Sequence, residues 1–110
     1  MQKNHVYSIF DRKAEYYLPI FQHRSDTDAI RDFTQVVMTS ETSISQYPAD
    51  FDLVRIGLLH LETGLIQAVH PAALVINGLV ALTNAQSERG RYKAVLAQQM
   101  DIEEIIAENP

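Results

Sequence analysis

The chain contains no cysteine and no tryptophan, and only four glycines and four prolines among its 110 residues. Without cysteine, neither a disulfide framework nor a thiolate zinc site can form, and the composition fits a reducing compartment. No apolar run approaches the roughly 20 residues that a membrane-spanning helix needs, so we expect no membrane contact. Disulfide-rich, zinc-ribbon and membrane-spanning proteins are therefore excluded.

Positive charge is also scarce. The chain has 9 basic and 14 acidic residues, a net charge of −5 at pH 7. Four acids fall in the last ten residues, which leaves 9 bases and 10 acids over positions 1–100. A strongly basic nucleic-acid-binding domain is excluded, so any phosphate contact must come from a local cluster of cations. The length of 110 residues indicates one domain, and the 46% of hydrophobic residues indicates that it is folded.

The first half of the chain predicts two strands and a helix. Aromatic and β-branched residues at 5–11 and 16–22 favour strands, separated by a polar turn at 12–15. Pro19 makes the second strand an edge strand or an irregular one. An amphipathic helix follows over 26–39. Its apolar stripe consists of Ala29, Ile30, Phe33, Val36 and Val37.

Either Ser25 or Asp26 can cap this helix. Residues 39–46 are rich in Ser and Thr and indicate a loop. Residues 51–61 then resemble a strand in which Gly57 marks a bulge, and 62–64 form the turn to a strand over 65–69.

His70 and Pro71 are expected to end that strand. Residues 72–82 are almost entirely apolar, and periodicity does not separate strand from buried helix there. We favour a short loop and a strand-like stretch up to Asn77 and Gly78, followed by a helical turn. Ser87 starts the last helix, which breaks near Met100.

These elements predict an α+β fold. An antiparallel sheet of about four strands, in the order ββαββ, packs on the central amphipathic helix and precedes a C-terminal helix. We expect a core domain over 1–86 and a helical extension with an acidic tail over 87–110.

No catalytic or metal-binding motif is present, so we expect neither enzymatic activity nor a cofactor. His60 and His70 could approach each other across the hairpin, but no third ligand accompanies them, and His5 and His23 are scattered. Asp50 and Asp52 form a pair of carboxylates, and the preference of Asp for turns is enough to explain their presence at these positions. Binding therefore remains the expected mode of action.

Two sets combine cations with tyrosines, which could hold phosphates and stack on unpaired bases. Each set is also compatible with an ordinary solvated surface. The first, around the two N-terminal strands, contains Arg12, Lys13, Tyr16, Tyr17 and Arg24. The second, near the C-terminus, contains Arg89, Arg91, Tyr92 and Lys93. The apolar stripe of the last helix could pack on its own sheet or pair with a second copy, and we expect a homodimer or higher oligomer.

Three segments in this order and spacing resemble one viral family over roughly residues 5–80. They are VYSIFD (6–11) with KAE (13–15), DTDAIRDF (26–33), and YPADFDL (47–53) followed by IG (56–57) and TG (63–64). The chain thereby resembles the small nonstructural protein of gokushovirus-type microviruses.

The resemblance implies a nonenzymatic viral protein of the host cytoplasm that binds single-stranded DNA. It would assist the switch from duplex replication to single-stranded genome synthesis and packaging. The alternative is a protein-interaction adaptor that contacts viral replication or capsid proteins and has little affinity for DNA. The acidic balance of the chain keeps this alternative open.

Overall fold

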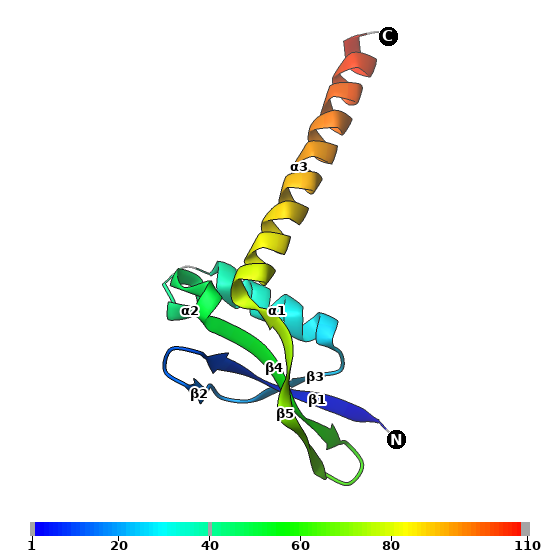
Figure 1. The fold of residues 1–110 in the computed structure, drawn as a ribbon. Coiled ribbons are helices and arrows are strands. Elements are labelled where there is room, and N and C mark those ends of the chain that lie inside the picture. Colours follow the sequence, from blue (N-terminus) through cyan, green and yellow to red (C-terminus); the bar gives the residue numbers. More distant parts are fainter. Residues whose placement is uncertain (1, 40, 109–110) are drawn as a thin grey trace.

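The computed structural model describes residues 2–39 and 41–108, with side chains up to residue 99. The fold is α+β, as predicted: α1 packs on an antiparallel sheet, and α3 projects away from it (Figure 1). The elements are β1 (Lys3–Asp11), β2 (Tyr16–Tyr17), β3 (Phe21–His23), α1 (Asp26–Met38), α2 (Ser43–Gln46), the 3-10 turn η1 (Pro48–Asp50), β4 (Phe51–His60), β5 (Ile66–Asn77) and α3 (Gly78–Glu108).

The sheet has five strands in the order β2-β1-β4-β5, and β3 also pairs with β1. The predicted second strand is thus two short strands that follow each other along one edge of β1. Between them, Leu18 is held at β1: its backbone N–H donates to Ile9 O at 2.9 Å, and its carbonyl accepts from Ser8 Oγ at 2.7 Å. Pro19 follows and has no N–H to donate, so regular pairing stops there.

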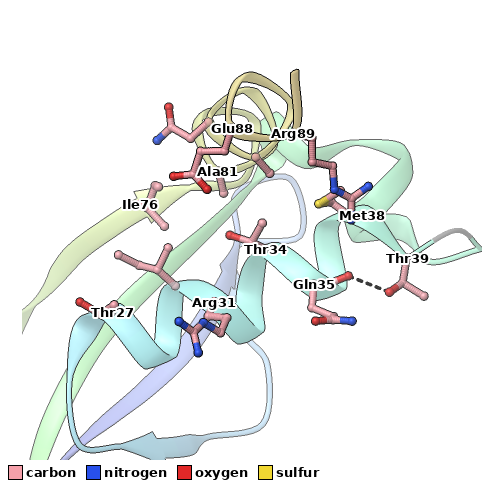
Figure 2. Close-up of a pocket in the computed structure, with 13 residues that line it drawn as sticks. Thr27, Arg31, Thr34, Gln35, Met38, Thr39, Ile76, Ala81, Glu88 and Arg89 are labelled. Carbon is pink, nitrogen blue, oxygen red and sulfur yellow. Dashed lines mark hydrogen bonds between the residues drawn. The ribbon is translucent and has the colours of Figure 1, made fainter. Parts of the chain in front are cut away.

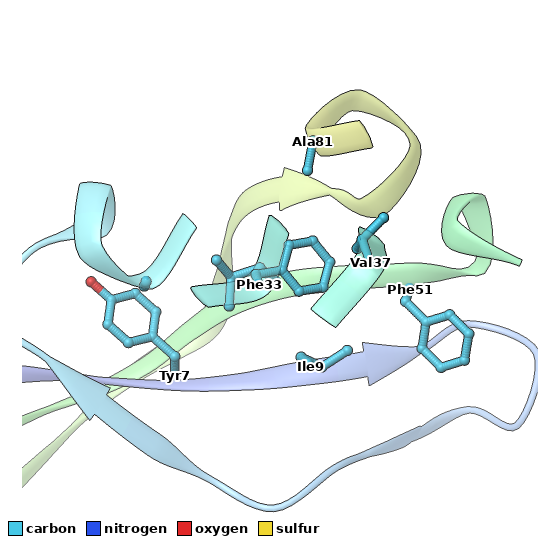
Figure 3. Packing of buried hydrophobic residues seen from close by; sticks show 8 residues of the cluster. Tyr7, Ile9, Phe33, Val37, Phe51 and Ala81 are labelled. Carbon is cyan, nitrogen blue, oxygen red and sulfur yellow. The ribbon is translucent and has the colours of Figure 1, made fainter. Parts of the chain in front are cut away.

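The core lies between α1 and the sheet (Figure 3). Ser25 caps α1, since its Oγ accepts from the Asp28 N–H at 3.3 Å. The predicted stripe is buried at Ala29, Phe33 and Val37, whereas Val36 lies at its exposed margin. The buried cluster consists of Tyr7, Ile9, Ala29, Phe33, Val37, Phe51, Leu53 and Ala81.

The predicted hairpin after Phe51 is present, but its second strand does not end at His70 and Pro71. β5 continues to Asn77 because the register shifts between the pairs Arg55–Ala73 and Gly57–Ala68. Residues 69–72 bulge out of the ladder there, so Pro71 needs no N–H for pairing. The predicted bulge at Gly57 is confirmed.

The favoured strand-like stretch up to Asn77 and the helical turn after it are confirmed. That turn is already the start of the last helix, so the predicted start at Ser87 is wrong, and so is the break near Met100. Asn77 caps the helix: its Oδ1 accepts from the Leu79 N–H at 2.9 Å, while its Nδ2 donates to Ala49 O at 3.0 Å and Asp52 Oδ1 at 2.8 Å. The boundary that we placed after residue 86 lies inside this continuous helix.

The predicted loop over 39–46 also contains a helical turn, α2. Thr42 and Ser45 cap it reciprocally, with the Ser45 N–H donating to Thr42 Oγ1 at 3.0 Å. The projecting helix α3 extends the molecule to 65 Å along its longest axis. Among the described residues, no helix combines the length and the apolar character needed to span a bilayer.

Candidate nucleic-acid interface

The turn between β1 and β2 presents two cations of the first predicted set. Asp11 shapes this turn, because its Oδ1 accepts from the backbone N–H groups of Lys13 and Ala14, each at 3.0 Å. Glu15 ends the turn, and its backbone lies in the left-handed region with a φ of 62°. The Arg12 and Lys13 side chains are exposed on this turn.

Arg12 is held against the body of the protein. Its Nη1 donates to Ala49 O at 3.3 Å, and its Nε lies 3.8 Å from Asp52 Oδ2. The Arg12 side chain is nevertheless 58% exposed, so it remains accessible to a phosphate. Arg12 therefore offers an oriented cation and Lys13 a freely extending one.

The two tyrosines of β2 stand beside these cations, and each is more than half exposed. Tyr17 pairs with Phe10, and the two ring centroids lie 4.8 Å apart. Tyr16 pairs with Asp11 and, as the neighbouring residue of a strand, points to the opposite face. Arg12 and Lys13 therefore lie on the turn that leads into β2, where Tyr17 has a supporting aromatic ring and Tyr16 lies on the other face.

Arg24 does not join this group. It follows β3, whose His23 pairs with His5 at the far end of β1. From His5 to Asp11 the strand covers about 20 Å. Arg24 instead borders a shallow depression near the N-terminus, beside Lys3 and Asn4.

The second predicted set lies on α3, where its members point in different directions around the helix axis. Arg89, Arg91, Tyr92 and Lys93 are all exposed. At 3.6 residues per turn, Arg91 lies about 200° around the axis from Arg89. Arg89 borders a groove between α1 and α3 together with Met38 and Glu88 (Figure 2). Arg89, the first residue of the second set, lies about 16 Å along the helix from Gly78, because each helical residue adds about 1.5 Å. The two sets therefore do not form one surface.

A third polar cluster escaped the sequence reasoning. Asp26 accepts from Tyr7 Oη at 2.6 Å and from Arg55 Nη1 at 3.0 and 2.8 Å. His5 and His23 flank Tyr7, each with its ring centroid 6.2 Å from the tyrosine ring. The cluster joins β1, α1 and β4, so its members are far apart in sequence. Arg55, a lone cation in an apolar strand, was the one signal that could have indicated it.

Burial raises the pKa of Tyr7, and the hydrogen bond to Asp26 raises it further. Burial alone would also raise the pKa of Asp26. The hydrogen bonds from Tyr7 and Arg55, together with the Arg55 charge, outweigh that effect and lower the pKa of Asp26. The cluster thus favours an ionised Asp26 and a neutral Tyr7, which is a structural arrangement that ties α1 to the sheet.

Asp26→Asn should therefore reduce stability at pH 7 by roughly 1 kcal/mol, since the group is partly exposed. A carboxyl with a lowered folded pKa stabilises above its unfolded pKa, near 4, and loses that contribution as pH falls through the folded value. Urea unfolding from pH 7 to pH 2 should show a shallower loss in Asp26→Asn than in the wild type. Asp28→Asn, an exposed change in the same helical turn, is the control. Parallel pH profiles for the wild type and Asp26→Asn would contradict this role.

Of the other histidines and carboxylates noted in the sequence, His60 and Asp52 have side-chain partners. His60 Nε2 lies 3.3 Å from Gln67 Oε1, and His70 is exposed in the bulge of β5. Asp52 accepts from Asn77, and the Asp50 carbonyl accepts from the Arg12 N–H at 2.8 Å. Within residues 2–39 and 41–108, no group of three or more candidate ligands could hold a metal ion.

The family model described as Phage ORF5 protein matches residues 4–82. The chain belongs to this phage protein family. No curated protein and no solved structure matches the chain. The matched region of this ORF5-family protein contains the sheet, α1 and the β1–β2 turn, and it ends in the first turns of α3.

Proposed function

We propose that this phage ORF5-family protein binds single-stranded DNA through the β1–β2 hairpin. The observation that carries the proposal is Tyr17, an exposed ring supported by Phe10, next to the exposed cations Arg12 and Lys13. A base can stack on the tyrosine while the cations contact the adjoining phosphates. This combination suits unpaired DNA, because duplex DNA does not present the faces of its bases.

The viral context follows from the resemblance to gokushovirus-type microviruses. In that setting the protein acts without catalysis, in the host cytoplasm, at the switch from duplex replication to synthesis and packaging of single-stranded genomes. The net charge of −5 does not oppose this role, because salt screens charges more than about 8–10 Å apart. The cations of the hairpin are therefore effective locally.

Fluorescence anisotropy with a labelled oligothymidine tests the proposal. Tyr17→Ala should weaken binding about tenfold, since stacking of one base contributes roughly 1–3 kcal/mol. Tyr17→Phe keeps the ring and should bind like the wild type. Equal affinities for all three proteins would remove Tyr17 from the site.

The salt dependence of the same titration tests the cations. Each phosphate contact in single-stranded DNA contributes about −0.7 to the slope of log K against log salt. Lys13→Ala should make that slope shallower by about this amount. Arg31→Ala removes an exposed cation from α1 and should leave the slope unchanged. A slope that does not respond to Lys13→Ala would place the phosphate contacts elsewhere.

A protein-interaction adaptor is the second candidate function. The exposed apolar residues of the projecting α3 favour it, as does the acidic balance of the chain. An adaptor that contacts replication or capsid proteins would show no binding to oligothymidine even at low salt. That result would exclude the first proposal in favour of this one.

A further inference from the structure

The outer part of α3 is unsupported in the isolated chain. Every residue from 86 to 99 is exposed, and α3 continues to Glu108. Three large apolar side chains share one face of this part at i, i+3 and i+4: Tyr92, Val95 and Leu96, with exposures of 66, 58 and 40%. Most of the stability of a helix in a protein comes from packing of its apolar face, and here that face has no partner within the chain's described residues.

The charges along α3 are separated into two segments. The basic segment, 89–93, has three cations, and the acidic segment, 101–108, has four carboxylates and no cation. Acidic residues at a helix C-terminus add to the negative end of the helix dipole, which is unfavourable. A cationic surface against the acidic segment would remove this penalty.

A second copy of α3 supplies both an apolar face and a cationic segment. We propose that two chains pair through α3 in an antiparallel orientation. Antiparallel pairing centred near residue 97 places the basic segment of each chain opposite the acidic segment of the other. It also buries the apolar face of Tyr92, Val95 and Leu96. Parallel pairing would set like charges side by side along both segments, which is destabilising.

This pairing has a consequence for the molecule's cations. The basic segment lies against acids of the partner subunit, so it is not free to hold DNA phosphates, and the hairpins remain the DNA-binding surfaces. From Gly78 to residue 97 the helix rises about 28 Å, so the two α3 starts lie about 57 Å apart. The pairing itself does not depend on DNA binding and holds even if the hairpin proposal fails.

A distance measurement on the full chain without DNA tests the orientation. The chain has no cysteine, so Ser87→Cys provides a single site for a spin label. In the antiparallel pair the two labels lie 20 residues apart along the helices, about 30 Å. In a parallel pair they lie on neighbouring helices whose axes are about 8–10 Å apart. A separation near 30 Å is expected, and one near the interaxial distance would overturn the antiparallel orientation.

Light scattering at micromolar concentration tests the interface. The wild type should be a dimer, and Val95→Asp should raise its dissociation constant at least tenfold. Ala94→Asp adds the same charge on the opposite side of α3 and should remain dimeric. Circular dichroism checks that both variants are folded, which is expected because both positions are exposed. A monomeric wild type, or a Val95→Asp variant that dimerises normally, would overturn the proposal.

Discussion

Phe33→Ala is expected to lower the free energy of unfolding by about 3–5 kcal/mol, because truncating a buried aromatic ring loses its burial and leaves a cavity. Phe33 is 1% exposed and lies at the middle of the buried stripe of α1, between Ala29 and Val37 (Figure 3). Urea unfolding monitored by circular dichroism would measure the loss.

Val36→Ala is the control for this prediction. Val36 is on the same helix but 36% exposed, so its truncation should cost less than about 1 kcal/mol. Similar losses for the two variants would mean that α1 does not dock on the sheet through the Phe33 face.

Gly78→Ala is expected to destabilise the fold by about 1–3 kcal/mol, the range for forcing an extra carbon into a filled space. A Cβ at Gly78 would lie 2.3 Å from the carbonyl oxygen of Pro48, a backbone atom of η1. Since η1 is tied to β4 and to Arg12, it cannot move aside freely. The start of α3 and η1 would have to separate, and thermal unfolding would report the loss.

Gly90→Ala, on the same helix, should have the opposite effect. Nothing lies within 4 Å of a Cβ at this position. Replacing an exposed helical glycine by alanine should therefore stabilise the helix by about 0.5–1 kcal/mol. Two Gly→Ala changes in one helix with shifts of opposite sign would establish that backbone packing, and not helix propensity, determines the effect at Gly78. Stabilisation by both would contradict the close approach to Pro48.

The elements that could be predicted are those specified by local patterns. The α1 stripe repeats every three to four residues and follows a capping serine, so its position depended on no distant contact. The start of α3 did depend on such contacts. Asn77 becomes a helix cap because its side chain is held by Ala49 and Asp52, and residues 72–82 are equally apolar on both sides of it. The extended path of β5 past Pro71 likewise required the register of β4.

In the candidate site, too, the features specified by local sequence could be predicted, and those that depend on distant contacts could not. The β1–β2 turn was predictable because the charged residues Arg12, Lys13 and Glu15 separate two strand-like segments, and this turn does lead into the strand that carries Tyr17. Arg24 was grouped with them by closeness in sequence, but the chain runs back along β1 and carries it to the far end. The contacts of Asp26 with Tyr7 and Arg55 span 19 and 29 residues and leave no periodic signal in the sequence.

The direct passage from β5 into α3 has a further consequence. Asn77 is the last residue of the strand and Gly78 the first of the helix, so no linker residue lies between sheet and helix. The direction in which each face of the outer helix points, relative to the sheet, is therefore determined by the number of helical residues that precede it. One inserted residue would rotate everything beyond it by about 100°, whereas seven would nearly restore the original direction. Changes in the length of α3 are therefore tolerated in steps of helical turns and not residue by residue.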